Sequence, residues 1–338
     1  MTTAPLVPQQ NRSCGPDAAG HAGNEELLPA GQEALLSGRI RPGIPLAPLT
    51  TLRVGGRAEW YCEPGSNLEL RQCLAWARAE GIPATLVGAG SNLLISDAGL
   101  PGLVIHTRRL RGLQLLEGGR IWAAAGEPLV NLARAAAKQG WSGLEWAIGI
   151  PGTLGGAVVM NAGAHGHAIA DVVVEVQILD EEQEPCRLKP ADLQFGYRRS
   201  RLQDLPWTVI GATLQLIPGQ DPAQVQWETQ RHLNQRLSSQ PYHLPSCGSV
   251  FRNPETYPAG WLIEQVGLKG YRIGGAQISE RHANFIVNCG QASANDIYRL
   301  IRLAQEKVYQ QWSILLEPEV RILGSFEDSS FALAGRSP

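Results

Sequence analysis

Features that define several classes of protein are missing from this sequence. Its six cysteines include no C-x-x-C pair, and the nearest two lie eleven positions apart, which argues against a zinc ribbon or a disulfide scaffold. No uninterrupted apolar stretch approaches the ~20 residues of a membrane helix. The formal net charge is -2, whereas nucleic-acid binding calls for a basic stripe. We therefore expect neither a membrane span nor a nucleic-acid partner.

The N-terminus also lacks a targeting signal, and lysine is rare. The first residues, MTTAPLVPQQNRSC, have neither a basic start nor an apolar centre, so we expect a cytoplasmic protein with reduced cysteines. Only four of the 29 basic Lys and Arg residues are lysines. Because arginine carries nearly all the positive charge, arginines beside glycine-rich loops could provide forked recognition of phosphate or carboxylate.

The sequence does contain enough hydrophobic residues for packed cores and enough glycine and proline for many turns. The 338 residues are 43% hydrophobic and include 38 glycines and 23 prolines, and this length favours two domains. An apolar stripe with Asn67 as its cap predicts a helix that stops at Gly81, and residues 129–137 predict another. We predict strands over residues 84–88, 93–96, 172–179, 209–217 and 316–323. The mixture places the fold in the α+β class.

Composition also suggests how the chain is divided. The first 45 residues are rich in Pro, Gly, Ala and Gln without a sustained period, which predicts a flexible extension; a short helix over Glu25–Leu36 is the alternative. A boundary near Pro218-Gly219 precedes a smaller domain, in which Ser293 to Asp296 resemble a helix capping box. The predicted parts are residues 1–45, 46–218, 219–325 and a tail at 326–338.

Two glycine-rich loops are candidates for ligand contact. The first is Gly88-Ala89-Gly90-Ser91-Asn92, and the second, GIPGTLGGAVVMNAGAHG at residues 149–166, contains six glycines. Backbone N–H groups in such turns can form a nest that holds a pyrophosphate without a cation. For the first loop alone an ordinary strand connection is the simpler interpretation. The glycine density of the second loop favours close approach of a ligand.

Neither loop follows a standard nucleotide-binding pattern. GAGSNL lacks the third glycine of a Rossmann fingerprint and runs into a strand, and no Gly-Lys-Ser/Thr occurs for a Walker loop. The G-x-S-x-G motif of serine hydrolases is also absent. The H-x-H spacing of His165 and His167 has no acids clustered beside it, so we expect no metal site. A different dinucleotide architecture is needed.

Six motifs, in order between about Thr50 and Gly324, resemble the UDP-N-acetylenolpyruvoylglucosamine reductase family. They are VGAGSNLLISD, GLEWAIGIPGTLGGAVVMNAGAHG, FGYRRSRL, CGSVFRNP, AGWLIEQVGLKGYRIGGAQISERHANFIVN and LEPEVRILG. The resemblance implies an FAD-binding domain of the vanillyl-alcohol-oxidase (PCMH) type at 46–218, made of two α+β subdomains. A smaller α+β substrate domain at 219–325 would follow it. The implied activity is the NADPH-dependent reduction of UDP-N-acetylglucosamine enolpyruvate to UDP-N-acetylmuramate, a peptidoglycan precursor.

By this resemblance, the glycine loops hold FAD at its pyrophosphate and flavin. GAGSN and its flanks lack the histidine to which relatives of the fold attach flavin covalently, which implies non-covalent binding. The implied cofactor-binding residues are Gly88, Ala89, Gly90, Ser91, Asn92, Gly149, Ile150, Pro151, Gly152, Gly155, Gly156, Gly163 and Ala164.

The implied reaction makes two demands on the catalytic residues. Hydride addition to an electron-rich enol ether requires charge to flow into the adjoining carboxylate, and the α carbon needs a proton. The motif match assigns the carboxylate clamp to Arg198, the proton donor to Ser249 and a supporting carboxyl to Glu319. We expect Glu319 to be buried with a raised pKa, because a neutral acid can donate a hydrogen bond.

Spacing alone gives each of these residues an ordinary explanation. Arg198 would belong to an exposed arginine run, Ser249 would satisfy a turn, and Glu319 would pair with Arg321 on one face of a strand. Only the resemblance favours catalytic roles.

The resemblance also implies which residues would contact the small nucleotide-sugar substrate. We expect the protein to be a monomer. Tyr197, Asn253 and His282 flank or match positions that face the nucleotide sugar, although a buried structural role explains His282 equally well. Cys247 stands where the family usually has a small residue such as alanine. The segment after Arg198 leaves little room for the tyrosine-bearing loop of some members, so the chain resembles the shorter type.

Two other functions remain open from the sequence. A flavin-dependent oxidase of the same fold, acting on a sugar or hydroxy acid, explains the glycine loops but not CGSVFRNP or LEPEVR. A nucleotide-binding module without catalysis would predict loss of Arg198, Ser249 or Glu319, and all three are present.

Overall fold

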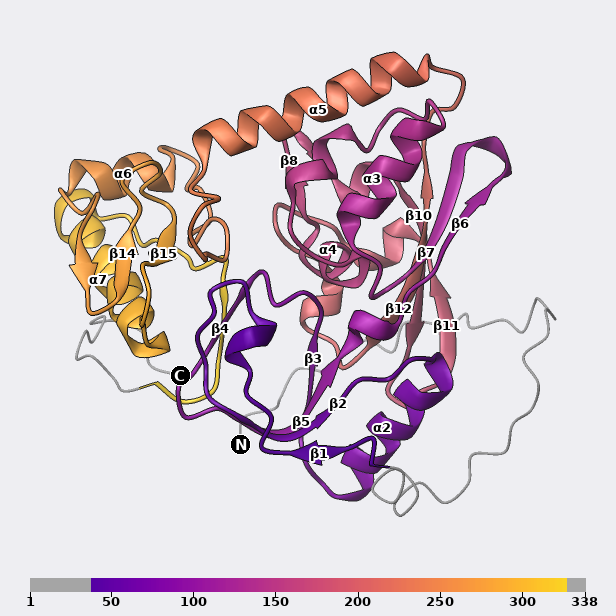
Figure 1. The fold of residues 1–338 in the computed structure, drawn as a ribbon, viewed down its shortest axis with the longest axis horizontal. Helices are drawn as coiled ribbons and strands as arrows, with labels where there is room; N and C mark the ends of the chain where they lie inside the picture. The colour runs from indigo at the N-terminus through magenta and orange to yellow at the C-terminus, as the bar shows by residue number, and fades with distance from the viewer. Residues whose placement is uncertain (1–37, 327–338) are drawn as a thin grey trace, which may run out of the picture.

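The computed structural model describes residues 38–326, which form two α+β subdomains and a smaller C-terminal domain (Figure 1). The alternative helix at Glu25–Leu36, most of the predicted extension and nearly all of the predicted tail lie outside this range. Within the predicted extension, Arg41–Pro42 forms strand β1 and Ile40 is buried, so this part belongs to the first sheet. The α+β class is confirmed.

The first subdomain is built on a mixed sheet with the strand order β1-β2-β5-β3. The strands β2 (Ala58–Cys62) and β3 (Ala84–Val87) both run parallel to β5 (Leu100–His106). Helix α2 (Asn67–Ala79) buries its apolar stripe beside them. The cap of α2 is Ser66, whose side chain accepts from the backbone of Glu69, so the expectation that Asn67 caps the helix is wrong.

The second subdomain is an antiparallel sheet with the order β11-β10-β12-β7-β6. Its main core is formed with helices α3 (Leu129–Lys138) and α4 (Leu154–Met160), whose apolar residues pack together with those of the sheet. The strands are β6 (Leu113–Leu116), β7 (Arg120–Ala124), β10 (Val173–Leu179), β11 (Pro185–Leu188) and β12 (Thr208–Gln215). The predicted strands at 172–179 and 209–217 are thus confirmed as β10 and β12.

The C-terminal domain packs helices against a small antiparallel sheet. Helix α7 (Ala294–Trp312) starts at the predicted capping box, since Ser293 accepts from the backbone of Asp296 and Asp296 accepts in return. The other elements are α6 (Ala259–Gln265), β13 (Arg272–Ile273), β14 (Ala276–Ile278) and β15 (Ile286–Asn288). Helix α5 (Pro222–Ser239) leads into this domain but packs on α3, across the top of Figure 1.

Short elements complete the described chain and connect its parts. Strand β4 (Leu93–Ile95) pairs in parallel with β16 (Arg321–Leu323), so the last strand within residues 38–326 lies beside the first subdomain. Two further short strands are β8 (Gly163–Ala164) and β9 (His167–Ala168). The 3-10 helices are η1 (Ala47–Leu49), η2 (Thr107–Arg109), η3 (Glu117–Gly119), η4 (Glu145–Gly149), η5 (Ile169–Asp171), η6 (Pro190–Leu193) and η7 (Arg201–Gln203).

Strand β16 is shorter than the predicted strand at 316–323, and this difference shapes the site. The backbone before β16 bonds instead to the C-terminal domain: Arg252 N donates to Glu317 O at 2.9 Å, and Glu319 N donates to Val250 O at 2.7 Å. These bonds place Glu319 close to the Cys247–Val250 turn. No helix in the described range is long and apolar enough to cross a membrane.

Candidate active site

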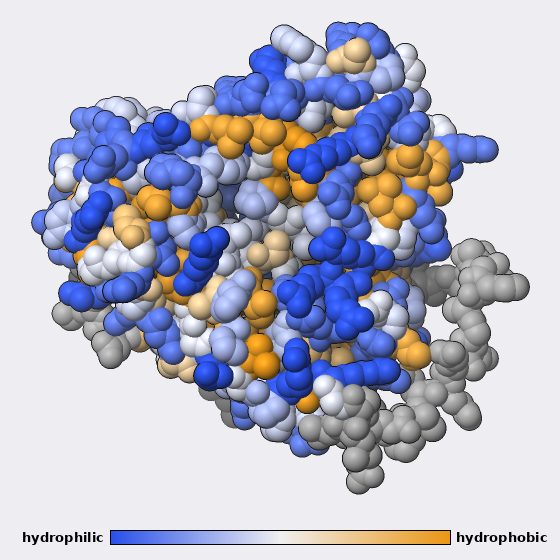
Figure 2. Space-filling view, in the orientation of Figure 1, coloured by the Kyte–Doolittle hydropathy of each residue, from blue (hydrophilic) through white to orange (hydrophobic). Residues whose placement is uncertain are grey.

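A cavity of about 890 Å³ lies where the two subdomains and the C-terminal domain meet. Figure 2 shows a hollow near the centre of the face in view, with both hydrophobic and hydrophilic residues around it. Both glycine loops line the cavity, as do Arg198 of the second subdomain, Ser249 of the C-terminal domain and Glu319 before β16. Residues from three parts of the chain therefore converge on one space.

The first glycine loop follows β3 and is tightly packed on one side. Gly90 has a φ of +62°, and a Cβ there would lie 2.1 Å from the carbonyl oxygen of Leu49. At Gly88 a Cβ would lie 2.5 Å from the hydroxyl of Thr153. Within the described chain, no group accepts a hydrogen bond from the backbone N–H groups of residues 89–92. This loop thus offers several free donors to a phosphate.

The second glycine loop lies against the first. The Ser91 hydroxyl donates to Pro151 O at 2.8 Å, and Thr153 caps α4 by accepting from Gly156 N. A Cβ on Gly155 would lie 3.0 Å from that of Ala125. Of the thirteen residues that the sequence implies for the cofactor, twelve line the cavity, and Gly149 lines a neighbouring one of about 490 Å³. The paired loops fit a dinucleotide.

Arg198 occupies a strained position in a tight hairpin. Gly196 and Arg199 exchange backbone hydrogen bonds of 2.9 and 3.1 Å, so Arg198 is the third residue of the turn, and its φ is +55°. Its Nε donates to Glu319 Oε1 at 2.9 Å, and its Nη2 donates to Gly163 O at 2.6 Å. A non-glycine residue in this conformation is uncommon and is often found at functional sites.

Glu319 is held by both its backbone and its side chain. Asn92 of the first glycine loop donates its Nδ2 to Glu319 O at 3.0 Å. The carboxylate is 16% exposed and pairs with Arg198, so the pairing with Arg321 considered from the sequence is wrong. Burial raises the pKa of Glu319, while Arg198 and, more weakly, Arg252 oppose the rise. The expected raised pKa is thus found.

Ser249 is held in the cavity by the turn that it belongs to. Gly248 before it has a φ of +80°, Ser246 before the turn forms a β-bridge with Val287, and the residues after Ser249 bond to Asn284. The side chain of Asn284 accepts from Phe251 N and donates to Phe251 O, while its carbonyl accepts from Val250 N. Burial raises the pKa of Cys247 to about 12, so this neighbouring thiol stays protonated.

The structure does not bring the three expected substrate-binding residues into the cavity lining. Tyr197 is 58% exposed, with its ring 5.2 Å from the Arg198 guanidinium carbon. Asn253 Oδ1 accepts from Ala259 N at the start of α6. His282 Nδ1 accepts from Asn284 N, and burial lowers the pKa of this ring. The contacts of Asn253 and His282 are structural.

Several lining residues were missed by the sequence analysis. The end of α5 contributes Arg236 and Gln240, and β16 contributes Arg321. Arg321 could have been found, because it lies two residues after Glu319 in a segment expected to be a strand. The α5 residues gave no such signal, because only the packing of that helix on α3 places them there.

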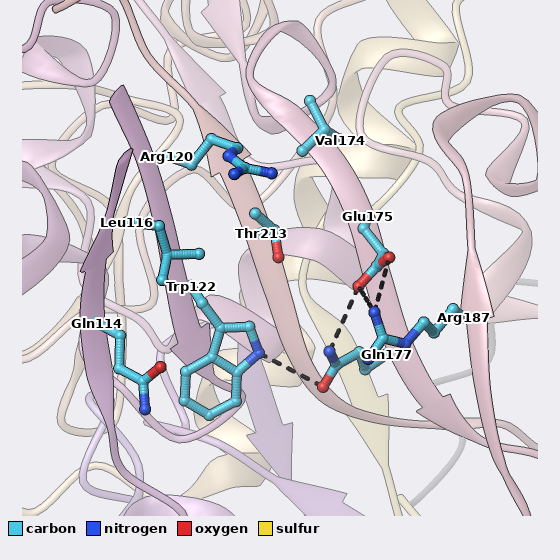
Figure 3. Close-up of a pocket in the computed structure, with 9 residues that line it drawn as sticks. All are labelled: Gln114, Leu116, Arg120, Trp122, Val174, Glu175, Gln177, Arg187 and Thr213. Atoms are coloured by element: carbon cyan, nitrogen blue, oxygen red, sulfur yellow. Dashed lines mark hydrogen bonds and ion pairs between the residues drawn. The ribbon is translucent and has the colours of Figure 1, made fainter. Parts of the chain in front are cut away.

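A separate hollow of about 550 Å³ lies on the open face of the five-stranded sheet (Figure 3). Trp122 donates its Nε1 to Gln177 Oε1 at 3.4 Å, and Arg187 pairs with Glu175 at 3.2 Å. None of the expected site residues lines it. Arg198, Ser249, Glu319 and the glycine loops line the larger cavity instead.

The fold and the paired glycine loops define an FAD-binding flavoprotein. Residues 58–188 match the model of an FAD binding domain, and residues 240–323 match that of the UDP-N-acetylenolpyruvoylglucosamine reductase C-terminal domain. The exact boundary near Pro218-Gly219 stays a prediction.

Whole-chain comparisons identify the family. A UDP-N-acetylenolpyruvoylglucosamine reductase of Synechococcus sp. (strain JA-3-3Ab) is 83% identical over 97% of this chain and 99% of its own length. One from Acaryochloris marina is 56% identical over 85% and 94%. The crystal structure of the Thermus caldophilus enzyme superposes with a TM-score of 0.71 at 35% identity, covering 84% of this chain and 98% of that one. The chain belongs to the UDP-N-acetylenolpyruvoylglucosamine reductase family, and the resemblance seen in its motifs is confirmed.

Proposed function

We propose that this protein reduces UDP-N-acetylglucosamine enolpyruvate to UDP-N-acetylmuramate, with NADPH as the reductant and FAD as the bound cofactor. The observation that carries the proposal is the convergence of Arg198, Ser249 and Glu319 on one cavity beside two glycine loops. The family membership supports the same reaction. The enzyme then supplies a precursor for peptidoglycan, and thus for cell shape and division.

FAD, when bound, supplies the hydride for this reaction. The free N–H groups of residues 89–92 suit its pyrophosphate, and the glycines of the second loop allow a flat ring system to approach the backbone. Nothing in this arrangement calls for a covalent bond, so we propose that binding is non-covalent.

Arg198 and Glu319 form the carboxylate-binding part of the site. An arriving substrate carboxylate competes with Glu319 for the Arg198 guanidinium, which keeps its charge at any working pH. Two carboxyl groups around one cation favour protonation of one of them. Glu319 takes that proton because burial already raises its pKa, and it can then donate a hydrogen bond to the substrate.

Ser249 is the proposed proton donor to the α carbon. A serine hydroxyl is a weak acid, but a carbon-centred enolate is basic enough to take its proton when the geometry is fixed. Asn284 provides that fixation by bonding to Val250 and Phe251, the two residues after Ser249. Cys247, two residues earlier, is only 5% exposed and also lines the cavity.

The finer properties of the enzyme are also proposals. We propose a cytoplasmic monomer with no nucleic-acid partner, since the substrate is a small nucleotide sugar and the net charge is slightly negative. Tyr197, exposed beside Arg198, remains a candidate substrate contact. Asn253 and His282 would contribute through the structure of the C-terminal domain instead.

The Ser249→Ala variant tests the proposed chemistry. NADPH should still bleach the yellow absorbance of this variant at the wild-type rate, because Ser249 has no part in that half of the reaction. Return of the colour on addition of the enolpyruvyl substrate should be slowed by about 10²-fold or more. Stopped-flow absorbance under anaerobic conditions measures both halves. Equal impairment of the two halves would contradict the role of Ser249.

A second measurement separates the reductase from a flavin-dependent oxidase. The reductase should recover its colour with the enolpyruvyl substrate in the absence of oxygen. Rapid oxygen-driven turnover with a simple sugar would favour the oxidase instead.

A further inference from the structure

Beneath the first glycine loop lies a chain of polar side chains that the proposed reaction does not use. Tyr61 belongs to β2, Glu63 follows that strand, His106 ends β5 and Arg108 lies in η2. Tyr61 and His106 are only 0% and 4% exposed. His106 pairs across the sheet with Val87, the residue just before Gly88. This row of polar side chains therefore ends directly under the Gly88–Asn92 loop.

Short contacts link the members of this chain. Arg108 Nη2 lies 2.8 and 3.0 Å from the two carboxylate oxygens of Glu63. The Tyr61 hydroxyl donates to Glu63 and lies 2.9 Å from His106 Nδ1. His106 also contacts the backbone of Gly88 in a way that favours the protonated ring, as a carbonyl acceptor does. An exposed cation is thereby connected to the loop.

These hydrogen bonds need one more proton than a neutral His106 ring supplies. Arg108 and the Tyr61 hydroxyl lower the pKa of Glu63, so its carboxylate only accepts. Tyr61 has one hydroxyl proton and gives it to Glu63, so His106 Nδ1 must carry a proton to bond to the Tyr61 oxygen. A neutral ring then has no second proton for the backbone of Gly88. Only the protonated ring donates in both directions.

The groups around His106 act on its pKa in opposite directions. Burial and the charge of Arg108 lower the pKa of His106, whereas Glu63, 3.7 Å from Nδ1, raises it. Two further arginines lie nearby: Arg41 of β1 is over the Tyr61 ring, and Arg111 lines the same hollow of about 490 Å³ as His106 and Arg108. The ring is therefore mainly neutral at neutral pH when no anion is near. A pyrophosphate on the loop above would add negative charge and favour the protonated ring.

We propose that His106 is a proton-linked positioning residue for FAD: its protonated ring fixes the Gly88–Asn92 loop around the cofactor pyrophosphate, so that FAD binding takes up a proton. This inference rests on the proposed placement of the pyrophosphate at that loop. The direction of the pH dependence follows from the linkage between proton uptake and FAD binding. Because bound FAD raises the pKa of His106, binding is tightest at low pH and weakens as the pH rises through the bound-state value.

The test measures release of FAD from the holoenzyme, followed by the fluorescence of free FAD after dilution, between about pH 5 and 8. The wild-type dissociation constant should rise with pH, by up to about tenfold for each pH unit by which FAD shifts the pKa of His106. His106→Gln, which cannot take up a proton, should bind FAD more weakly at the acidic end and lose the slope. The exposed Tyr271→Phe variant is the control and should match the wild type.

A second variant keeps the inference testable if His106→Gln does not fold. In Tyr61→Phe the ring no longer needs a proton for the Tyr61 oxygen, so a neutral ring can give its one proton to Gly88, and the slope should become shallower. An unchanged slope in either folded variant would overturn the inference. A purified protein that holds no FAD at all would contradict the proposed function instead, whatever the role of His106.

Discussion

At the scale of single residues, the conformation of Arg198 shows how the site is assembled. A left-handed non-glycine residue costs about 1–3 kcal/mol, and the structure accepts this cost at the residue whose guanidinium joins Glu319 and Gly163. The motif match suggested Arg198, but its conformation depends on the hairpin and on Gln203, which donates to Arg198 O at 3.1 Å. No sequence pattern carried that information.

The raised pKa of Glu319 predicts a pH dependence. The neutral form is proposed to donate to the substrate, so turnover should fall as the pH rises through the pKa of Glu319 in the complex. Glu319→Gln stays neutral at every pH and should lose this alkaline limb, with a lower rate at the optimum. The measurement is the pH profile of kcat for colour recovery with the enolpyruvyl substrate. A variant that keeps the wild-type limb would show that another group titrates.

At the scale of elements, local patterns predicted most helices and strands, and long-range contacts decided the rest. The Ser293–Asp296 capping box was found because its signal lies within four residues. The strand expected at 316–323 shrank to Arg321–Leu323 because Val250 and Arg252 take the earlier hydrogen bonds. Such competition between distant segments cannot be read from periodicity.

The first glycine loop gives a prediction at this scale. Gly90→Ala should destabilise the protein by more than the ~1–2 kcal/mol of a left-handed alanine, because the new Cβ would meet the Leu49 carbonyl. Gly81→Ala is a matched control, since Gly81 has a similar φ of +66° and open space around it. Thermal unfolding of the two variants and their FAD content give the comparison. Equal destabilisation and full FAD content in both would contradict the tight packing of the loop.

At the scale of the whole molecule, the active site exists only because three parts of the chain are held together. Asp97 of the first subdomain accepts from Ala294 N and Asn295 N at the start of α7, at 2.9 and 3.0 Å. Strand β16 pairs with β4, and α5 packs on the second subdomain. The sequence indicated the parts, and its family motifs indicated the three proposed catalytic residues. It could not show that Asn284 and Arg236 would join them.

The most direct test of the account is a single anaerobic titration of the purified enzyme. The protein should be yellow, NADPH should bleach it without oxygen, and one equivalent of UDP-N-acetylglucosamine enolpyruvate should restore the colour as UDP-N-acetylmuramate forms. A protein that is bleached by NADPH but stays colourless with this substrate would contradict the claim that Arg198, Ser249 and Glu319 form its reduction site.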